Sequence, residues 1–425
     1  MGKGGRSEPA FKRQEDNVWR SPYNPLDPKA PELPTKGQIK AVIPQHCFQR
    51  SYVWGMYYVF RDTVMSAALV YATSKLLSTE IPSDPLQIPL WALGWSFYAF
   101  WQGVILTGHW VLAHECGHGA FSPSQTWNDI VGFVIHQALL VPYFAWQYSH
   151  AKHHRRTNHL VDGESHVPST AEDNGLVRSG NSYERSTFYA AWHEAMGDGA
   201  FAAFQVWSHL VVGWPLYLLG LASTGKVTHK GEPLNGAIMD HFRPNSPMFP
   251  PKHSNKILMS TVTVIATLAG LGYLMYQYGA LPVTLWYWLP YTNVNAWLVL
   301  YTWLQHTDPS IPHYGEGEWS WVKGALSTID RDYGIFCFFH HRIGSTHVAH
   351  HLFHEMPWYH AKEATDAIKK FLEPKGLYNY DPTPWYKAMW RIAHTCHYVD
   401  SNEGIQYLKS LEDVPLSKDL KKKAA

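Results

Sequence analysis

Cysteine is scarce in this chain of 425 residues: four occur, far apart and without a CxxC pair. Neither a disulfide framework nor a cysteine-based zinc site is therefore indicated, and a reducing, cytosol-facing environment fits best. A net charge is lacking too, because 35 Lys and Arg stand against 34 Asp and Glu. This balance leaves no electrostatic case for nucleic acid as a partner.

An apolar leader is also missing, because residues 1–34 are polar and rich in Pro, Lys and Glu. We therefore expect no cleaved signal peptide and membrane insertion through internal segments. Aromatic residues and histidine are abundant by contrast, with 20 Trp, 25 Tyr and 26 His. Trp and Tyr are enriched at membrane interfaces, although a large aromatic core would give the same composition.

Four apolar stretches have about the ~20 residues that a helix needs to cross a bilayer core. They form two pairs, at residues 57–74 and 86–112 and at residues 257–276 and 281–304. Two further stretches, 130–146 and 201–221, are interrupted by Pro142 and Pro215. We expect interfacial or half-inserted helices there.

The basic residues indicate how the chain would be oriented. The turns within the two pairs, residues 75–87 and 277–279, hold almost no Lys or Arg, whereas the other span ends are flanked by them. By the positive-inside rule both hairpin tips lie outside and both termini are cytosolic. The closing Lys421-Lys422-Lys423-Ala424-Ala425 resembles a dilysine retrieval signal of the endoplasmic reticulum, or is a solvated basic tail.

Together these patterns predict an all-α integral membrane protein. It has two transmembrane helical hairpins, which make four spans, and a cytosolic helical cap that holds a di-metal site. The predicted divisions are a polar cytosolic N-terminal segment (1–50), a membrane domain (51–370) and a cytosolic C-terminal tail (371–425).

Three histidine clusters lie at or just beyond the cytosolic ends of the predicted spans. In each cluster the i, i+3 or i+4 spacing puts the rings on one face of a helix. The clusters read HECGH, HAKHH and HVAHH, and a ninth candidate ends the fourth span; these residues are His114, His118, His150, His153, His154, His347, His350, His351 and His306.

A single histidine on a helix is more often a hydrogen-bonded structural residue than a ligand, but paired spacing in three clusters is hard to explain by packing. Nine ring nitrogens exceed the four that a structural zinc takes, which favours two metals with open positions. By ligand type alone Fe, Zn, Cu and Ni suit imidazole about equally.

The first cluster also satisfies the HExxH pattern of zinc proteases, in which Glu115 would be the general base. The additional paired histidines have no role in a protease site. Glu115 is then the candidate catalytic carboxylate that orients an imidazole through its other ring nitrogen, with an exposed helical Glu as the alternative. A histidine-rich metal transporter is a further alternative, but it would place its ligands within the spans.

Two such metals beside a bilayer suggest oxidation of a lipid. An aliphatic C–H bond offers no charge for an acid or base, so its cleavage needs a cofactor oxidant, and oxygen activated at iron meets that need. The site lies where a lipid chain could pass from the bilayer into an apolar tunnel.

At this point the sequence resembles the membrane fatty acyl desaturases, specifically the microsomal omega-6 (oleate Δ12) group, over roughly residues 34–370. The strings that carry the resemblance are AHECGHGAFS (113–122), LVPYF (140–144), LQHTDP (304–309), DRDYG (330–334), THVAHHLF (346–353), YHA (359–361) and EAT (363–365).

The resemblance implies two irons held by the nine histidines named above, molecular oxygen, and electrons from NADH through cytochrome b5 reductase and cytochrome b5. The fused cytochrome b5 domain of front-end desaturases, marked by HPGG, does not occur here. A separate cytochrome b5 is therefore expected to dock on the cytosolic face, where Lys152, Arg155 and Arg156 could meet an acidic partner.

The expected reaction is desaturation of oleate in membrane lipid to linoleate, in the endoplasmic reticulum. Glu115 in the first cluster favours Δ12 over ω3 enzymes, while the long tail looks like those of fungi and protists, some of which act at both positions. A bifunctional Δ12/ω3 desaturase and a hydroxylase on the same scaffold stay open, as does a homo-oligomer. His109, His159 and His354 lie outside the family pattern and are expected to tolerate substitution.

Overall fold

The computed structural model describes residues 18–414, except 180, 181, 186, 187 and 223. The dilysine-like tail at 421–425 lies outside the described residues. The protein is mostly helical, as expected, with two short antiparallel strand pairs that the sequence did not predict. These pairs are β1 (Leu176–Ser179) with β2 (Ser182–Arg185), and β3 (His313–Tyr314) with β4 (Ile405–Gln406).

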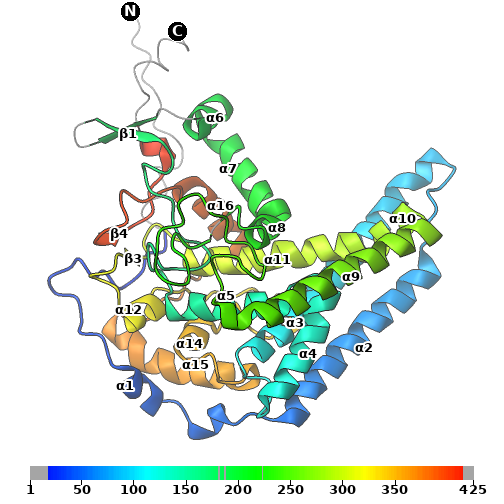
Figure 1. Ribbon diagram of the computed structural model, residues 1–425, viewed down its shortest axis with the longest axis horizontal. Coiled ribbons are helices and arrows are strands. Elements are labelled where there is room, and N and C mark those ends of the chain that lie inside the picture. Colours follow the sequence, from blue (N-terminus) through cyan, green and yellow to red (C-terminus); the bar gives the residue numbers. More distant parts are fainter. Residues whose placement is uncertain (1–17, 180–181, 186–187, 223, 415–425) are drawn as a thin grey trace, which may run out of the picture.

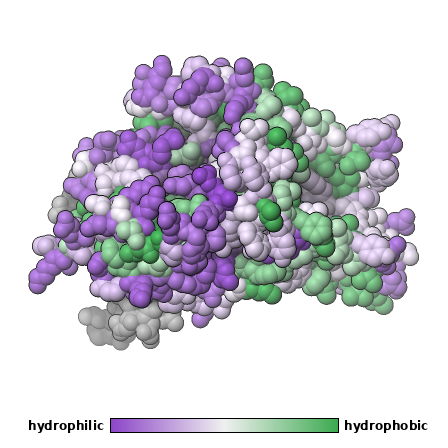
Figure 2. Space-filling model, turned by 90° about the horizontal axis from the view of Figure 1, so that it is seen from below, coloured by the Kyte–Doolittle hydropathy of each residue, from purple (hydrophilic) through white to green (hydrophobic). Residues whose placement is uncertain are grey.

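Each of the four predicted spans lies in helix. They correspond to α2 (Tyr52–Leu76), α3 (Ile88–Gly117), α9 (Ser254–Tyr278) and a segment made of α10 (Ala280–Val283), the π turn η6 (Thr284–Trp288) and α11 (Leu289–His306). Both hairpin turns lie at the same end of the molecule (Figure 1). Large apolar side chains are exposed along α2, the start of α3 and α9, and Figure 2 shows apolar surface gathered toward one end of the protein.

Among the described residues, one helix is long and apolar enough to cross a membrane by itself, Pro251–Tyr278. The predicted half-inserted stretch 130–146 falls in α4 (Gln125–Ala138) and α5 (Tyr143–Arg155), a pair bent by 108° that forms either a broken span or a re-entrant loop. The second interrupted stretch becomes α7 (Asp198–Trp207), the π turn η4 (Ser208–Val212) and α8 (Gly213–Leu218). The four-span topology stays a prediction.

The remaining helices cover the end of the bundle that carries the histidines (Figure 1). The α-helices are α1 (Lys36–Ala41), α6 (Phe188–Met196), α12 (Trp321–Leu326), α13 (Phe336–Phe339), α14 (His347–Leu352), α15 (Trp358–Leu372) and α16 (Trp385–Thr395). Short helical turns are η2 (Gln45–Phe48), η3 (Pro85–Gln87), η5 (Pro251–His253), η7 (Glu373–Lys375) and η8 (Leu411–Asp413).

The histidine-bearing ends are positioned by the contact between α3 and α11, the most extensive between any two helices described. The two backbones meet at Gly103, where an added Cβ would lie 2.4 Å from the Cβ of Asn293 and 2.9 Å from the carbonyl oxygen of Pro290. Only glycine allows this approach, because the Cβ of any other residue at this position would overlap these atoms and push the helices apart. Gly103 therefore lets the middle of α3 pack closely against the beginning of α11.

Residues after 370 pack against the histidine-bearing part of the chain. Ile392 and Ala393 of α16 belong to the same apolar cluster as Leu304 of α11. Four buried charged side chains extend this contact: Arg331 bonds Asp381 at 2.7 Å, and Arg391 bonds Asp381 at 2.9 Å and Asp308 at 2.6 Å. The division of the chain at residues 50 and 370 stays a prediction.

Removal of one charge from this buried network should destabilise the fold strongly. We expect Asp381→Asn to lower the stability by about 3–5 kcal/mol, because Arg331 and Arg391 would lose a shared carboxylate that they cannot replace with water. The measurement is the unfolding transition of the purified protein in detergent. Asp366→Asn, which breaks the exposed pair with Lys362 on α15, is the control and should cost about 1 kcal/mol or less. Equal effects of the two substitutions would contradict the structural role of the network.

Candidate metal centre

Four helices bring the nine predicted histidines together. The end of α3 carries His114 and His118, α5 carries the second cluster, His306 is the last residue of α11, and α14 carries the third cluster. All nine are buried except His118 and His150, which are partly buried. They form two groups, and each HxxHH cluster contributes histidines to both of them.

The first group contains five histidines whose nearest ring nitrogens all lie within 4.8 Å of one another: His114, His118, His150, His154 and His350. The Nε2 atom of His114 lies 2.8 Å from that of His150 and 3.3 Å from that of His118. The Nε2 atoms of His150 and His154 are 3.2 Å apart. We call this set the five-histidine group.

The second group contains His153, His306 and His351, again within 4.8 Å. His306 is its centre, since its Nε2 atom lies 3.1 Å from that of His153 and 2.9 Å from that of His347. His347 therefore completes a four-histidine group. In both HxxHH clusters the i, i+4 pair enters one group and the residue at i+3 enters the other, because the helix turns about 100° per residue.

Two of the ring nitrogens in the four-histidine group, the Nε2 atoms of His153 and His351, carry no proton. The Nδ1 atom of His153 donates to the carbonyl oxygen of Glu164 at 2.6 Å, and a carbonyl oxygen can only accept. The Thr157 hydroxyl donates to the His153 carbonyl oxygen and so accepts from Nδ1 of His351 at 3.0 Å. The Nε2 atoms of both histidines are thus left as bare lone pairs.

Bare nitrogens that face one another at about 3 Å repel unless a cation lies between them. Two imidazoles bound to one metal at ~2.1 Å and ~90° apart hold their nitrogens about 3.0 Å apart. The Nε2 separations of 2.8–3.3 Å in the two groups match that spacing. The buried Nε2 atoms of His350 and His351 also have no hydrogen-bond partner among the described residues. The donor set therefore fits two metal ions.

The electrostatic environment keeps these rings neutral. Burial lowers the pKa of all nine imidazoles, to about 4 for His153 and to about 3 for His350, and neighbouring imidazoles lower the pKa of His350 further. Neutral imidazole is the form that binds metal, so little proton release would accompany metal binding near neutral pH.

Glu115 lies directly behind the five-histidine group. Its buried carboxylate accepts from Nδ1 of His114 at 3.0 Å and lies 3.9 Å from Nδ1 of His350. Burial raises its pKa well above the usual range, so the carboxylate form that accepts from His114 would require the positive charge of a metal bound at the group. The carboxylate contacts the far side of the His114 ring, so it holds the proton on Nδ1 and leaves Nε2 free to face the group.

Sequence reasoning missed the residues that support the histidines from outside the clusters. Besides Thr157 and the Glu164 carbonyl, Asp330 accepts at 2.9 Å from the backbone N–H of Val348 and so caps α14. The Tyr378 hydroxyl donates to the other carboxylate oxygen of Asp330. Asp330 belongs to the family string DRDYG, so that string was the available signal.

Some expectations about neighbouring residues need correction. Lys152, expected to meet an acidic partner, is buried and pairs with Asp162 at 3.2 Å, and Arg156 pairs with the same carboxylate at 2.9 Å. Only Arg155 of the three is exposed. His159 is buried, and its Nδ1 atom accepts from the backbone of residues 161 and 162; its tolerance to substitution stays a prediction.

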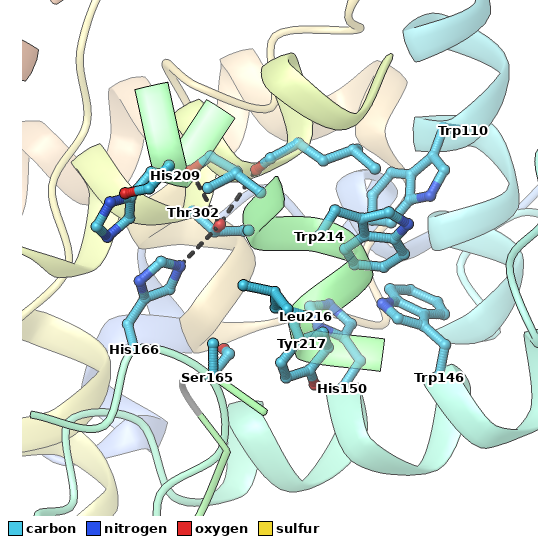
Figure 3. Close-up of a pocket in the computed structure, with 15 residues that line it drawn as sticks. Trp110, Trp146, His150, Ser165, His166, His209, Trp214, Leu216, Tyr217 and Thr302 are labelled. Carbon is cyan, nitrogen blue, oxygen red and sulfur yellow. Dashed lines mark hydrogen bonds between the residues drawn. The ribbon is translucent and has the colours of Figure 1, made fainter. Parts of the chain in front are cut away.

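A cavity of about 170 Å³ reaches the five-histidine group at His150 (Figure 3). Trp146 stacks on that ring, with 4.5 Å between the ring centres, and Trp110 and Trp214 lie on the same side of the cavity. Most of the lining is apolar or aromatic. The cavity therefore offers a mostly apolar space beside the histidines.

Comparison with known proteins gives consistent matches. A sequence profile described as fatty acid desaturase matches residues 89–382. A Delta(12)-fatty-acid desaturase from Vernicia fordii is 40% identical over 95% of this chain and 97% of its own length. The omega-6 fatty acid desaturase, endoplasmic reticulum, from Brassica juncea is 40% identical over 94% and 96%. A Delta(12) fatty acid desaturase from Mortierella alpina is 40% identical over 89% and 91%.

Loss of one nitrogen from either group should release metal. We expect His118→Ala, His153→Ala and His350→Ala each to lower the metal content of the purified protein and to abolish its activity, while the protein still inserts into membranes. His354→Ala is the matched control, because its ring centre lies 5.0 Å from that of His118 yet it belongs to neither group. Full metal content and normal turnover in all three variants would refute the assignment.

Glu115→Gln should weaken metal binding without removing the site. The amide oxygen can still accept from Nδ1 of His114, but its charge is gone, and changes of this kind behind a ligand cost about 10–100-fold in metal affinity or activity. Metal titration and turnover measure the effect. Proteolysis by the purified wild type that is sensitive to chelators and lost in Glu115→Gln would instead restore the protease interpretation.

Proposed function

The chain belongs to the fatty acid desaturase family, and we propose that it introduces a cis-Δ12 double bond into oleate held in membrane lipid, which gives linoleate. It is an oxidoreductase of lipid metabolism. The observation that carries the proposal is the pair of histidine groups in a chain 40% identical, nearly end to end, to Delta(12) desaturases.

We assign the metals as two iron ions. The five-histidine group would hold one iron through His114, His118, His150, His154 and His350. The four-histidine group would hold the other through His153, His306, His347 and His351. When bound, the irons would supply the activation of molecular oxygen that breaks unactivated C–H bonds.

The protein's own residues set up that chemistry. Glu115, Thr157 and the Glu164 carbonyl keep protons on the outer ring nitrogens, so the inner nitrogens stay available as ligands. Because these acceptors are buried and already paired, the rings cannot rotate without the loss of a hydrogen bond. Glu115 positions the His114 ring. The HExxH pattern is then explained without a protease, and the many histidines without a transporter.

The apolar cavity beside His150 is the proposed place for the acyl chain. Its aromatic lining would exclude water and hold a methylene segment near the histidines, and orientation at this distance decides which carbon reacts. The same argument leaves the outcome sensitive to small shifts of the chain, since hydroxylation and desaturation share the first hydrogen removal. The named relatives favour desaturation at Δ12.

The protein is a membrane protein by family, and we propose the four-span arrangement with both termini cytosolic, in the endoplasmic reticulum. The relative from Brassica juncea carries that location in its name. A separate cytochrome b5 would deliver electrons from NADH and its reductase on the cytosolic face, where Arg155 is the exposed basic residue of the second cluster. A homo-oligomer stays open.

Expression in a yeast that makes only monounsaturated fatty acids tests the reaction. We expect linoleate with a cis-Δ12 bond, formed on phospholipid-bound oleate and dependent on oxygen and cytochrome b5. Gas chromatography with mass spectrometry of double-bond derivatives reads both reaction type and position. The variant His306→Ala, expressed to the same level, is the inactive control.

The other products distinguish the remaining alternatives. α-Linolenate beside linoleate would indicate a bifunctional Δ12/ω3 enzyme, and 12-hydroxyoleate would keep the metal centre but replace desaturation by hydroxylation. No changed fatty acid from an iron-loaded protein supplied with cytochrome b5 would leave the oleate proposal without support.

A further inference from the structure

A separate set of metal-ligating side chains lies outside the histidine groups, where η2 contacts α15. It consists of His46 and Cys47 from η2 and His360 and Glu363 from α15. One ligand atom of each lies within 4.8 Å of the others. The two pairs are more than 300 residues apart in the sequence, so the fold alone brings them together.

The distances approach those of a tetrahedral site. The Nε2 atom of His46 lies 2.9 Å from a carboxylate oxygen of Glu363 and 3.8 Å from Sγ of Cys47. With zinc bonds of ~2.3 Å to sulfur and ~2.0–2.1 Å to nitrogen or oxygen, adjacent ligand atoms in a tetrahedron are about 3.3–3.6 Å apart. The two distances from His46 differ from these values by a few tenths of an ångström, and the remaining pairs lie within 4.8 Å.

The backbone around these residues is already held in place. Tyr359, beside His360, accepts at 2.8 Å from the backbone N–H of Ser51, and its hydroxyl lies 3.4 Å from the carbonyl oxygen of Gln49. His360 and Glu363 are three residues apart on α15, which puts them on one helical face. The segment after η2 is thus tied to α15 by contacts that do not involve the four candidate ligands.

The candidate ligands differ in burial, as expected for a metal site that an ion can enter from solvent. Cys47 is fully buried, whereas the side chains of His46 and Glu363 are each 51% exposed. A thiolate beneath the metal and polar ligands toward solvent leave an entry path for the ion. The set mixes sulfur, nitrogen and oxygen, which suits zinc and excludes magnesium or calcium, because those ions prefer oxygen ligands alone.

We propose that His46, Cys47, His360 and Glu363 bind one Zn²⁺, separate from the histidine centre. On binding, the Cys47 thiol gives its proton to solvent and the thiolate becomes a ligand. The sequence shows no CxxC spacing at this site, because His46 beside Cys47 is joined by His360 and Glu363 from a distant helix. The assignment stands or falls independently of the proposed function.

The zinc would clamp the segment before α2 to the helix that follows the third histidine cluster. Only residues 353–357 separate α14 from α15. Met356, just before α15, and Trp358, its first residue, line a small cavity together with Glu115 and His350. Zinc at the η2–α15 contact would therefore stabilise the wall behind the five-histidine group, and its role is structural.

Metal analysis of the full-length purified protein tests the proposal. After exposure to Zn²⁺ and removal of the excess, we expect about one zinc per chain in the wild type. Glu363→Gln and His46→Gln should each lose most of that zinc while they keep the iron of the wild type. Asp366→Asn, which neutralises a neighbouring carboxylate on the same helix, is the matched control and should keep its zinc.

Replacement of zinc by cobalt tests whether the Cys47 sulfur is a ligand. Co²⁺ in the site should give a thiolate-to-cobalt charge-transfer band, which Cys47→Ser abolishes and Cys396→Ser keeps. Equal zinc in the wild type, His46→Gln and Glu363→Gln, or a wild type that takes up none, would overturn the proposal and leave a hydrogen-bonded cluster. Because His46 and Glu363 are half exposed, their variants should fold even where Cys47→Ser does not.

Discussion

The constraint on which this structure depends is the position of single protons. An imidazole can bind a metal through Nε2 only if its proton sits on Nδ1, and in a buried site that proton needs an acceptor from the protein. Glu115, the Thr157 hydroxyl and the Glu164 carbonyl provide such acceptors for His114, His351 and His153. Without them these three rings could carry the proton on either nitrogen, whereas the buried Nδ1 atoms of His154, His306 and His347 have no hydrogen-bond partner among the described residues.

Rigid packing keeps the rings within the required distances. Gly103 lets the middle of α3 pack closely against the beginning of α11, and the two helices carry His114 and His306 near their C-terminal ends. Arg331 donates to the Leu304 carbonyl oxygen and pairs with Asp381, so the C-terminal segment contributes to the position of the residues just before His306. A buried ion network of this kind adds little net stability compared with apolar packing, but removal of one partner is costly.

The environment of a motif, rather than the motif itself, decides its chemistry. HECGH has the pattern of a zinc protease, yet its Glu115 lies behind the His114 ring, at Nδ1, and the two rings of the pattern share their group with three other imidazoles. Cys47 gives the converse case, since a cysteine with only His46 beside it in the sequence meets His360 and Glu363 through the contact of η2 with α15. In both places further partners come from distant parts of the chain.

The sequence by itself determined the local pattern. Spacings of three and four residues put the histidines on single helical faces. The three clusters and the histidine that ends the fourth span identified all nine that the structure gathers, and the apolar stretches identified the segments that form α2, α3, α9 and α11. Only the tertiary structure decided that His150 and His154 join His350 while His153 joins His351, and that Lys152 is buried against Asp162. The physical reason is that spacing along a helix sets the direction of a side chain around the axis of that helix. Which partner the side chain meets depends on how the helices cross.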